Sequence, residues 1–483
     1  MKRLHPSISL VARAPWVRLT LAGTIVLSLA GCAALMQRQP APGPVPATPS
    51  PVPQVPVEIP VRIEPLPGQL DATPVFNSNN PEIVQEPGIL LSTITPTSTD
   101  DAAVFLDHAF EGNFSVFTHH IAKDTVPGEK LLYLGFLATN RTDHPVALDL
   151  LAGASYLSQP DAPFQSLEPL IIDPEGVVFA GPGDRIATDL LHGRSPISPQ
   201  RFTLEPHQTL LLFQWSVPTT VSIGPPTNGR TTLLRMKSDG PIALSEVAYF
   251  APKSPGGGFT TPVPDDFLAV LLAARRAGPA EPPATPYTPG EPLPKGPFRY
   301  GRVAGVSVGD RWTATVDGAR LPMPGERLGF PIATAVLNTL GTGQVQSAPM
   351  LKRYEGSAYQ AHGNYGVTYE LRFPLDNQGD LPRTLSVGLS HPARVVGDRP
   401  ATAAGYLDPP NRPVMFRGPV KVEWFDDQGR QQTRYTHLVI QHGQSMPPFV
   451  TLEVPAHTRY DVKVTLLFPA DATPPQLLTL SSP

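Results

Sequence analysis

The sequence predicts an all-β fold of two antiparallel β-sandwich domains, placed after a signal peptide and a proline-rich tether. Apolar and β-branched residues recur in short runs, and Gly, Pro, Asn and Asp separate one run from the next. Hydrophobic residues make up 41% of the 483 residues, which suffices for real cores. Only one stretch has convincing helix signals. Many short strands with turn-rich joints are typical of β-sandwiches.

The first 31 residues have the layout of a secretory signal peptide. Lys2, Arg3 and Arg18 contribute to a basic start that contains no acidic residue. The apolar run 19–30 that follows is too short to span a bilayer comfortably. No other apolar stretch approaches about 18 residues, so we expect no transmembrane helix.

The four residues Leu29-Ala30-Gly31-Cys32 resemble a bacterial lipobox. The resemblance implies that the signal is cleaved, that the thiol of Cys32 is diacylated, and that the lipid tails hold the exported chain on a membrane. An inert, buried cysteine is the alternative. Because Ala33 and not Asp follows the cysteine, the outer membrane is favoured. Cys32 is the only cysteine, so we expect no internal disulfide.

Residues 32–67 are predicted to be a lipidated N-terminus and a tether. Residues 40–67 contain eleven prolines, a composition typical of extended polyproline II. Directly after a lipidated cysteine, such a segment would hold the folded part away from the membrane, and mere low complexity is the alternative. The first β-sandwich domain is then expected over residues 68–263.

The one expected helix begins at Pro264 and ends near Gly278. Pro264 and the two aspartates after it suit a first turn, Arg275 and Arg276 suit a last turn, and Gly278 suits the position beyond the end. Eight prolines between Gly278 and Phe298 predict a linker. Residues 264–298 therefore separate the first domain from a second β-sandwich domain, expected over residues 299–483.

Eight runs carry the strand pattern most clearly, and a hairpin turn is expected at Phe425–Gln431. The runs are KLLYLGFLA (130–138), PVALDLL (145–151), TLLLFQWSV (209–217), VTYELRF (367–373), TLSVGLS (384–390), VKVEWF (420–425), YTHLVI (435–440) and YDVKVTLLF (460–468).

The two halves share a turn with the spacing N-x-x-D-x-P, at Asn140–Pro145 and at Asn377–Pro382. Asn and Asp side chains bond to their own backbone in turns, and proline suits the restart of an edge strand. Three further matches occur in the same order: FEG (110–112) with YEG (354–356), FTLEPH (202–207) with VTLEVPAH (450–457), and KSDGP (237–241) with the final LSSP. An internal duplication explains this order, and chance similarity between two β-domains is the alternative.

Five long blocks of the sequence carry a family resemblance. They are LPGQLDATPVFNSNNPEIVQEPGILLST (66–93), SYLSQPDAPF (155–164), FAGPGDRIATDLL (179–191), YGRVAGVSVGDRW (300–312) and LGTGQVQSAPMLKRY…AHGNYG (340–366). They are similar to the cyanobacterial family called domain of unknown function 3370, over about residues 62–480. The resemblance implies a cyanobacterial envelope protein, and it brings no activity and no catalytic residues with it.

Two short motifs suggest chemistry but lack the context for it. Gly305-Val-Ser307-Val-Gly309 fits G-x-S-x-G, but a nucleophile elbow needs a helix after its turn, and the sequence that follows is β-like. His119 and His120 are adjacent, and on a strand they point to opposite faces rather than to one metal ion.

Two groups of carboxylates have simpler interpretations. Asp376–Asp380 is rich in oxygen ligands, but a plain turn explains it better than a calcium site. Asp161, Asp184 and Asp189 could serve glycoside hydrolysis, although solvated loops are the default interpretation. We therefore expect no enzyme activity, no metal ion and no cofactor.

The best candidate for a binding site is the segment 350–366. It contains the six candidate ligand-binding residues Arg353, Tyr354, Tyr359, His362, Asn364 and Tyr365. Aromatic rings suit the apolar faces of sugars, while amide and guanidinium groups can orient sugar hydroxyls. The alternative is that these tyrosines close the sandwich core.

These observations favour a non-catalytic cell-envelope lipoprotein that binds glycan or another envelope component, such as an envelope protein. A structural or assembly spacer is the second hypothesis, and a glycan-active hydrolase is the third. The net charge of −4 gives no basic footprint for nucleic acid. A pocket with two carboxylates about 5–10 Å apart would favour the hydrolase. An exposed planar strip of aromatic rings would favour binding.

Overall fold

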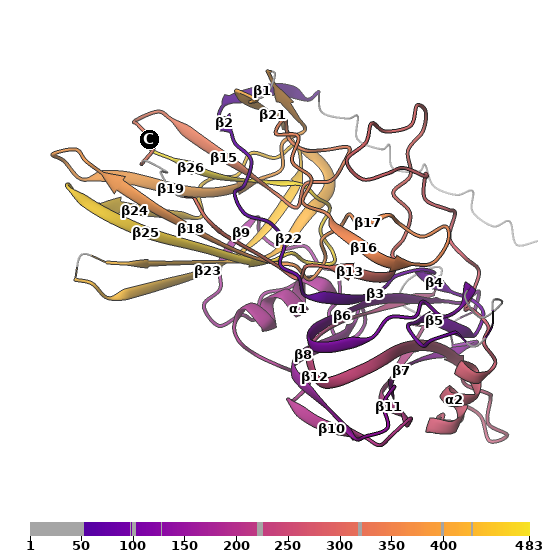
Figure 1. Cartoon of the computed structure of the whole chain (residues 1–483). Coiled ribbons are helices and arrows are strands. Elements are labelled where there is room, and N and C mark those ends of the chain that lie inside the picture. The colour runs from indigo at the N-terminus through magenta and orange to yellow at the C-terminus, as the bar shows by residue number, and fades with distance from the viewer. Residues whose placement is uncertain are drawn as a thin grey trace, which may run out of the picture. The chain divides into compact units, whose positions relative to one another are not determined.

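The computed structural model describes residues 53–96, 98, 103–126, 128–219, 226–316, 321–397, 400–426 and 428–483. The predicted signal peptide, Cys32 and the first part of the predicted tether lie outside the described residues. The prediction of an all-β fold is confirmed: these residues form 26 strands and two helices, and most paired strands run antiparallel (Figure 1). Within the same residues, no helix is both long and apolar enough to cross a membrane.

The first sandwich is held together by β12 (Thr227–Phe250), which belongs to two layers in turn. Its first part pairs with β6 (Phe110–Lys123) and β8 (Val146–Leu157). Beyond a shift in register between Ser238 and Ile242, it pairs with β7 (Leu131–Asn140). A strand that changes sheets at such an irregularity can close the corner of a sandwich. All of these strands belong to one 12-stranded sheet that folds over to form both layers. Its other strands are β3 (Pro74–Ser78), β4 (Ile83–Val84), β5 (Gly88–Ser92), β10 (Gln200–Leu204), β11 (Thr209–Pro218), β13 (Ala304–Val308), β16 (Ala348–Arg353) and β17 (Gln360–Ala361).

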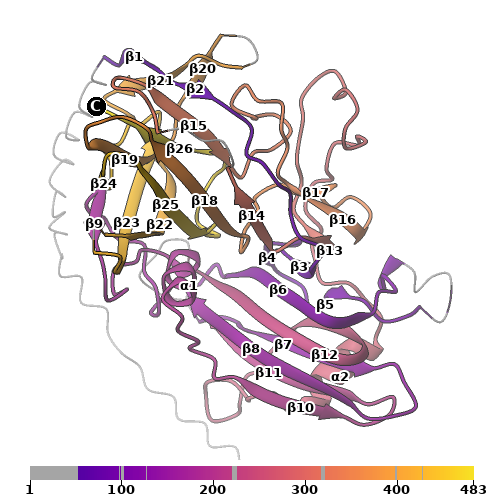
Figure 2. The same ribbon diagram turned by 60° about the vertical axis from the view of Figure 1, so that its left-hand side comes forward.

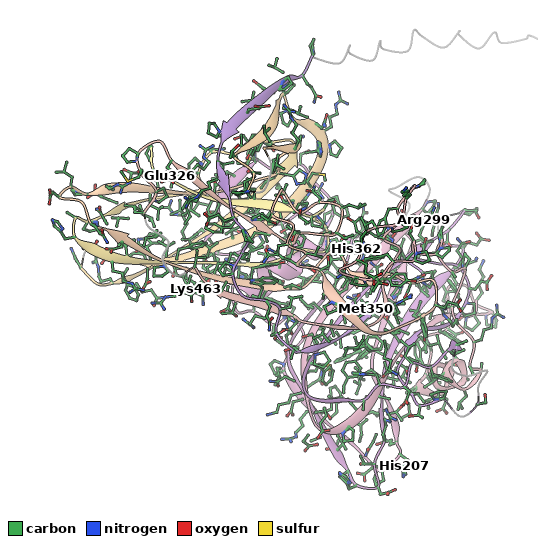
Figure 3. The ribbon with its side chains drawn as sticks, turned by 45° about the horizontal axis from the view of Figure 1, so that its top comes forward. His207, Arg299, Glu326, Met350, His362 and Lys463 are labelled. Carbon is green, nitrogen blue, oxygen red and sulfur yellow. The ribbon has the colours of Figure 1, made fainter. Side chains whose placement is uncertain are left out.

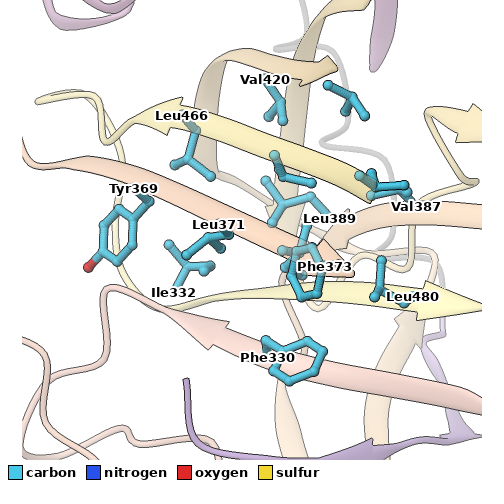
Figure 4. Packing of buried hydrophobic residues seen from close by; sticks show 14 of the residues in the cluster. Phe330, Ile332, Tyr369, Leu371, Phe373, Val387, Leu389, Val420, Leu466 and Leu480 are labelled. Atoms are coloured by element: carbon cyan, nitrogen blue, oxygen red, sulfur yellow. The ribbon is translucent and has the colours of Figure 1, made fainter. Parts of the chain in front are cut away.

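The second sandwich packs a six-stranded sheet on a five-stranded sheet (Figure 2). The six strands, in spatial order, are β14 (Arg311–Thr315), β18 (Thr368–Asn377), β25 (Thr458–Leu467), β22 (Asn411–Phe425), β23 (Gln431–His442) and β9 (Leu170–Ile172). The five are β2 (Arg62–Ile63), β15 (Arg327–Ile332), β26 (Gln476–Ser481), β19 (Arg383–Ser390) and β24 (Val450–Val454). Phe330 and Leu480 of one sheet share a buried core with Leu371 and Phe373 of the other (Figure 4). A separate small sheet contains β1 (Val55–Pro60), β21 (Ala403–Asp408) and β20 (Arg394–Val396).

The two sandwiches share one scheme of strand pairing, as an internal duplication predicts. In the first, β10 pairs with β8, β11 with β7, and β12 with both β8 and β6. In the second, β24 pairs with β19, β25 with β18, and β26 with both β19 and β15. β6 and β15, which begin the two schemes, each have a parallel neighbour: β3 pairs with β6, and β2 pairs with β15. The match of FEG with YEG does not fit this scheme, because FEG begins β6 whereas YEG follows β16.

Strand pairing crosses the predicted domain boundaries in both directions. β1 and β2 fall in the predicted tether, yet Val61, Ile63 and Leu66 are buried in the second half of the molecule. β9, from the predicted first domain, pairs with β23, whereas β13 and β16 extend the sheet of the first. The apolar residues between the last prolines of the tether explain the first departure, because they bury more favourably than they hydrate.

The helices also differ from expectation. The predicted helix, α2, spans Pro264–Leu272 and ends before its two arginines. The chain then runs beside β5, where the Ile89 N–H donates to the Arg275 carbonyl and the Ala277 N–H donates to the Ile89 carbonyl. A second helix, α1 (Pro182–Leu191), was not expected. It packs against β8 and β22 and so contacts both sandwiches (Figure 2).

Candidate functional site

The structure distributes the six predicted binding residues over three surroundings. Tyr354 is buried, so it is a structural residue and leaves the candidate site. Its hydroxyl accepts a hydrogen bond from the Ser92 N–H at 3.0 Å and donates one to the Val104 carbonyl at 2.5 Å. The guanidinium of Arg276 lies 4.0 Å from the centre of its ring. Burial raises the pKa of the hydroxyl, which therefore stays a donor.

Asn364 is also structural. It is buried with a φ of 48°, a backbone conformation that Asn tolerates better than most residues. Its side-chain amide donates to the Gln346 carbonyl at 2.8 Å and to the Tyr369 hydroxyl at 3.0 Å. These bonds hold the loop that precedes β18, and Asn364 likewise leaves the candidate site.

Three other predicted residues join aromatic side chains of the predicted linker and Tyr300, which lies just beyond it. The Arg353 guanidinium lies 3.7 Å from the centre of the Tyr359 ring, and the His362 ring stacks on Tyr300 at 4.6 Å. Burial lowers the pKa of His362 to about 4, so the stacked ring is neutral at pH 7. Tyr287 and Phe298 connect the two pairs, and we call these six partly exposed residues the aromatic cluster: Tyr287, Phe298, Tyr300, Arg353, Tyr359 and His362.

The aromatic cluster is not a planar strip. Its successive rings meet at 53°, 67° and 83°, and only the rings of Tyr300 and His362 are close to parallel, at 17°. Tilted and edge-on contacts are typical of aromatic rings that pack on one another. The cluster therefore fastens the linker to the segment 350–366 more plainly than it offers a face to a ligand.

The sixth predicted residue, Tyr365, lines a cavity of about 470 Å³. One wall is formed by β4, β6 and β12 of the first sandwich, and the other by the loop 470–473 of the second and the start of α1. We call this cavity the central pocket. Its aromatic residues are Phe117, Phe164 and Tyr365, and its main polar residues are Asn79, Glu82, His119, Asn228, Arg302 and Asp471.

An amide oxygen in the central pocket lacks a partner. The side chain of Asn79 is almost fully buried, and its Oδ1 atom has no hydrogen-bond partner within the described part of the chain. An unpaired buried acceptor costs about 1–3 kcal/mol. Native proteins rarely leave such a group unsatisfied, so Asn79 marks a position where a ligand hydroxyl or a water molecule would donate.

Glu82 connects two other polar side chains of the pocket. It forms an ion pair with Arg302, and its carboxylate lies 3.8 Å from Nε2 of His119. Burial lowers the pKa of His119 to about 3, so this ring is neutral at pH 7 and can both donate and accept hydrogen bonds. Its Nδ1 atom lies 2.8 Å from the Thr231 hydroxyl. Burial also raises the pKa of Glu82, against the effect of the nearby arginine.

Asp471 is the second carboxylate of the pocket, on the opposite wall. Its Oδ2 atom accepts a hydrogen bond from the Asp184 N–H in the first turn of α1, at 2.9 Å. Burial raises the pKa of Asp471 to about 7, and the nearby Asp184 carboxylate adds to the rise. Behind it, Asp184 forms a fully buried pair with His437 at 2.8 Å. Asp471 therefore joins the second sandwich to the helix of the first.

The residues of the short motifs have structural roles in the fold. Ser307 is buried in β13, and β14 rather than a helix follows it. As predicted, the two adjacent histidines face opposite ways: His119 lines the pocket, and His120 is buried beside Glu246 at 3.1 Å. Asp189 accepts a hydrogen bond from the Tyr156 hydroxyl. Among the described residues, no group of three or more His, Cys, Asp or Glu side chains could hold a metal ion.

Sequence reasoning missed most of the central pocket. Glu82, Arg302 and Asp471 lie far apart along the chain, and none stands in a motif. Only the N-terminal strands and the crossing of β13 bring them together. Two signals were usable: Tyr365 belonged to a segment chosen for its mixture of rings and polar groups, and Glu82 and Arg302 lie in blocks that carry the family resemblance.

Comparison with known proteins gives a family and no activity. No curated protein matches the chain. The chain matches the family described as "Protein of unknown function (DUF3370)" over residues 61–482, which includes both sandwiches and every residue of the central pocket. This protein is therefore a member of that family.

Proposed function

We propose that this protein is a non-catalytic lipoprotein of the cell envelope that binds a glycan in the central pocket. The observation that carries the proposal is the composition of the pocket. Three aromatic side chains stand beside amide, imidazole, guanidinium and carboxylate groups, and the acceptor Oδ1 of Asn79 is buried without a partner among the described residues.

A sugar suits these surroundings in three respects. Its apolar ring faces can stack on aromatic rings. Its hydroxyls both donate and accept, so they can satisfy Asn79 and the neutral ring of His119 together. The cavity volume falls within the roughly 300–1,000 Å³ typical of small-molecule sites.

The envelope location is supported by the sequence. A basic start, a short apolar run and the lipobox-like residues Leu29 to Cys32 favour export and lipid anchoring. Prolines concentrated after Cys32 favour an extended segment between the lipid and the folded unit that begins at Pro53.

A glycan-active hydrolase is the second candidate, because Glu82 and Asp471 line one pocket and the pKa of each is raised. Both carboxylates already have structural partners, however. Glu82 is paired with Arg302, and Asp471 holds the first turn of α1. A spacer role is less favoured, since a spacer has no use for a residue such as Asn79, which lines a cavity and has a buried amide oxygen without a partner among the described residues.

Binding is tested with Phe164→Ala, which removes a half-exposed ring from the pocket. Envelope oligosaccharides would be screened against the full-length chain in detergent, and the best of them titrated by calorimetry. We expect affinity to fall by about 1–3 kcal/mol, a loss typical of an aromatic contact, with little change in the melting temperature. Phe425→Ala is the matched control, because Phe425 is exposed to 53% against 56% for Phe164 and lies outside the pocket. Equal losses in both variants would contradict the proposal.

The hydrolase candidate is tested on the same oligosaccharides. New reducing ends that appear with the wild type and vanish with Asp471→Asn would favour catalysis over simple binding.

The lipid anchor is tested with Cys32→Ala. Labelled fatty acid should enter the wild type and not the variant, which should also migrate as the uncleaved precursor. Labelling that survives the substitution would defeat the lipoprotein assignment.

A further inference from the structure

A second cavity, of about 290 Å³, lies between α1 and the outer face of the six-stranded sheet. Side chains alternate between the two faces of a strand. In β25, Val462, Val464 and Leu466 therefore point into the core, and Lys463 and Thr465 point out into the cavity. Figure 3 labels Lys463 on this strand. We call this cavity the basic pocket.

Four cationic side chains line the basic pocket, against one carboxylate. Arg235 and Lys421 have acids of their own, Asp310 at 2.5 Å and Glu423 at 2.9 Å. Arg311 and Lys463 share the single lining carboxylate, that of Glu370. Among the ion pairs of the described residues, the cations of this cavity therefore exceed their acidic partners by one. A surplus positive charge between a helix and a sheet attracts an anion, and salt screens it less than it screens charges on an open surface.

An unused hydrogen-bond donor adds an independent indication. Thr465 lines the basic pocket and is 7% exposed, and its Oγ1 atom has no hydrogen-bond partner within the described residues. Buried hydroxyls are nearly always paired in native proteins. The Thr465 hydroxyl can donate to an anion held by Lys463 and Arg311, which would satisfy it.

The remaining wall of the cavity is apolar. Leu190 and Leu191, at the end of α1, line this wall, and Leu467 adds a third apolar side chain from the strand of Lys463 and Thr465. A bare inorganic ion would leave this wall in contact with water. A ligand that carries a carbon skeleton beside its anionic group would use both walls.

We propose that the basic pocket binds the anionic group of a small carbon-based ligand, namely a carboxylate, sulfate ester or phosphate ester of the kind found on acidic sugars. The site is separate from the central pocket and does not depend on the function proposed for it. It would let one molecule contact two parts of a glycan, or two different envelope components.

The test is calorimetric titration of the full-length chain, in detergent and low-salt buffer, with four probes. Glucuronate and glucose 6-phosphate carry an anionic group on a carbon skeleton, inorganic phosphate is the bare ion, and glucose is the neutral control. We expect the two sugar anions to bind more tightly than glucose, and their affinity to fall as sodium chloride is added. If inorganic phosphate binds as tightly as glucose 6-phosphate, the carbon skeleton contributes nothing to binding, and the proposal of a carbon-based ligand is overturned.

Two variants and a matched control decide which residues act. Lys463→Gln should lower the affinity for the sugar anions by about tenfold, because a charge-assisted hydrogen bond is lost. Thr465→Val should lower it severalfold. Arg372→Gln is the control, because Arg372 lies beside Lys463 in the strand register, pairs with Asp461 at 2.7 Å, and does not line the cavity. The proposal is overturned if no sugar anion binds, or if Lys463→Gln and Arg372→Gln bind alike.

Discussion

Buried histidines couple the stability of this protein to pH. Burial lowers the pKa of His119 to about 3 and those of His362 and His391 to about 4. In the unfolded chain each ring takes up a proton near pH 6.5, so the unfolded state binds more protons below that pH. Stability is therefore lost as the pH falls from about 6.5 toward 4. The raised pKa values of Asp471 and Glu82 act in the opposite sense.

Replacing His362 by Phe should make this acid destabilisation shallower. Phenylalanine keeps the stack on Tyr300 and removes a titrating ring whose Nδ1 atom has no hydrogen-bond partner among the described residues. Each unit of pKa shift corresponds to about 1.4 kcal/mol, so the variant should retain up to about 2 kcal/mol more stability at pH 4.5, after allowance for partial exposure. Urea unfolding over a pH series measures the effect. His144→Gln, at an exposed position, should leave the pH profile unchanged, and parallel profiles for His362→Phe would exclude this role.

The residues of segment 350–366 show what composition can and cannot predict. Their mixture of rings and polar groups marked a segment that contributes to the core, to the aromatic cluster and to the central pocket. Composition could not assign each residue to a surrounding, because the partners come from distant parts of the chain. Tyr354 is buried and forms hydrogen bonds with residues 92 and 104. Tyr365 lines the central pocket beside Phe117.

Two asparagines hold equivalent corners of the two sandwiches. The side-chain amide of Asn140 donates to the carbonyls of residues 144, 204 and 205, and that of Asn377 donates to those of residues 381, 454 and 455. Each amide therefore ties its own N-x-x-D-x-P turn to the end of a second strand, β10 in the first sandwich and β24 in the second. His207 and His457 follow with φ values of 56° and 54°. The N-x-x-D-x-P pattern predicted the turns, and its mechanical reason lies in this amide.

Replacing Asn377 by Asp should destabilise the second sandwich strongly. The change puts a carboxylate oxygen where an NH₂ group faces three carbonyl oxygens, so the donors are lost and the buried charge keeps only the bond that Oδ1 accepts from the Gly379 N–H. We expect a loss of about 2–4 kcal/mol in the free energy of unfolding, measured in urea. Asp380→Asn is the control in the same turn, because Asp380 is 95% exposed and its pair with His457 should matter little. Similar midpoints for the two variants would show that the amide bonds contribute little.

At the scale of elements, local pattern predicted the central strands well. All eight predicted runs lie within or at the edges of strands, and the hairpin turn at Phe425–Gln431 joins β22 to β23. The failures have a physical cause in each case. α1 has signals for its start, Pro182 and Asp184, but its apolar face was too short to stand out. β2 and β9 have two and three residues, too few for any periodicity to be seen.

At the scale of the molecule, the order of strands along the chain does not determine which sandwich receives them. β3 enters the first sandwich directly after β2 has entered the second, and β9 and β13 cross in opposite directions. Sequence patterns report burial and period but not partners. Both cavities lie where the sandwiches meet, so neither could be predicted before these crossings were known.

The crossings give residues 53–67 a role that a tether would not have. Val61, Ile63 and Leu66 are buried, β2 pairs with β15, and β1 pairs with β21. Gln344 fixes the end of this segment through two hydrogen bonds to the backbone of Leu66, at 3.1 Å and 2.6 Å. The segment is therefore a structural part of the second half of the molecule.

A chain that begins at Gly68 should consequently be less stable than one that begins at Pro53. Each of the three buried apolar side chains contributes about 1.5–3 kcal/mol when fully buried, so we expect the shorter chain to lose several kcal/mol in unfolding free energy, if it folds at all. The measurement is the urea midpoint of both chains, with Val61→Asn in the longer chain as a single-site check. The shorter chain should also expose Phe330 and its neighbours to a dye that binds apolar surface, because the core of the second sandwich lies beneath this segment. Equal midpoints and equal dye binding would mean that residues 53–67 contribute nothing to the core and act only as the tether that their prolines predicted.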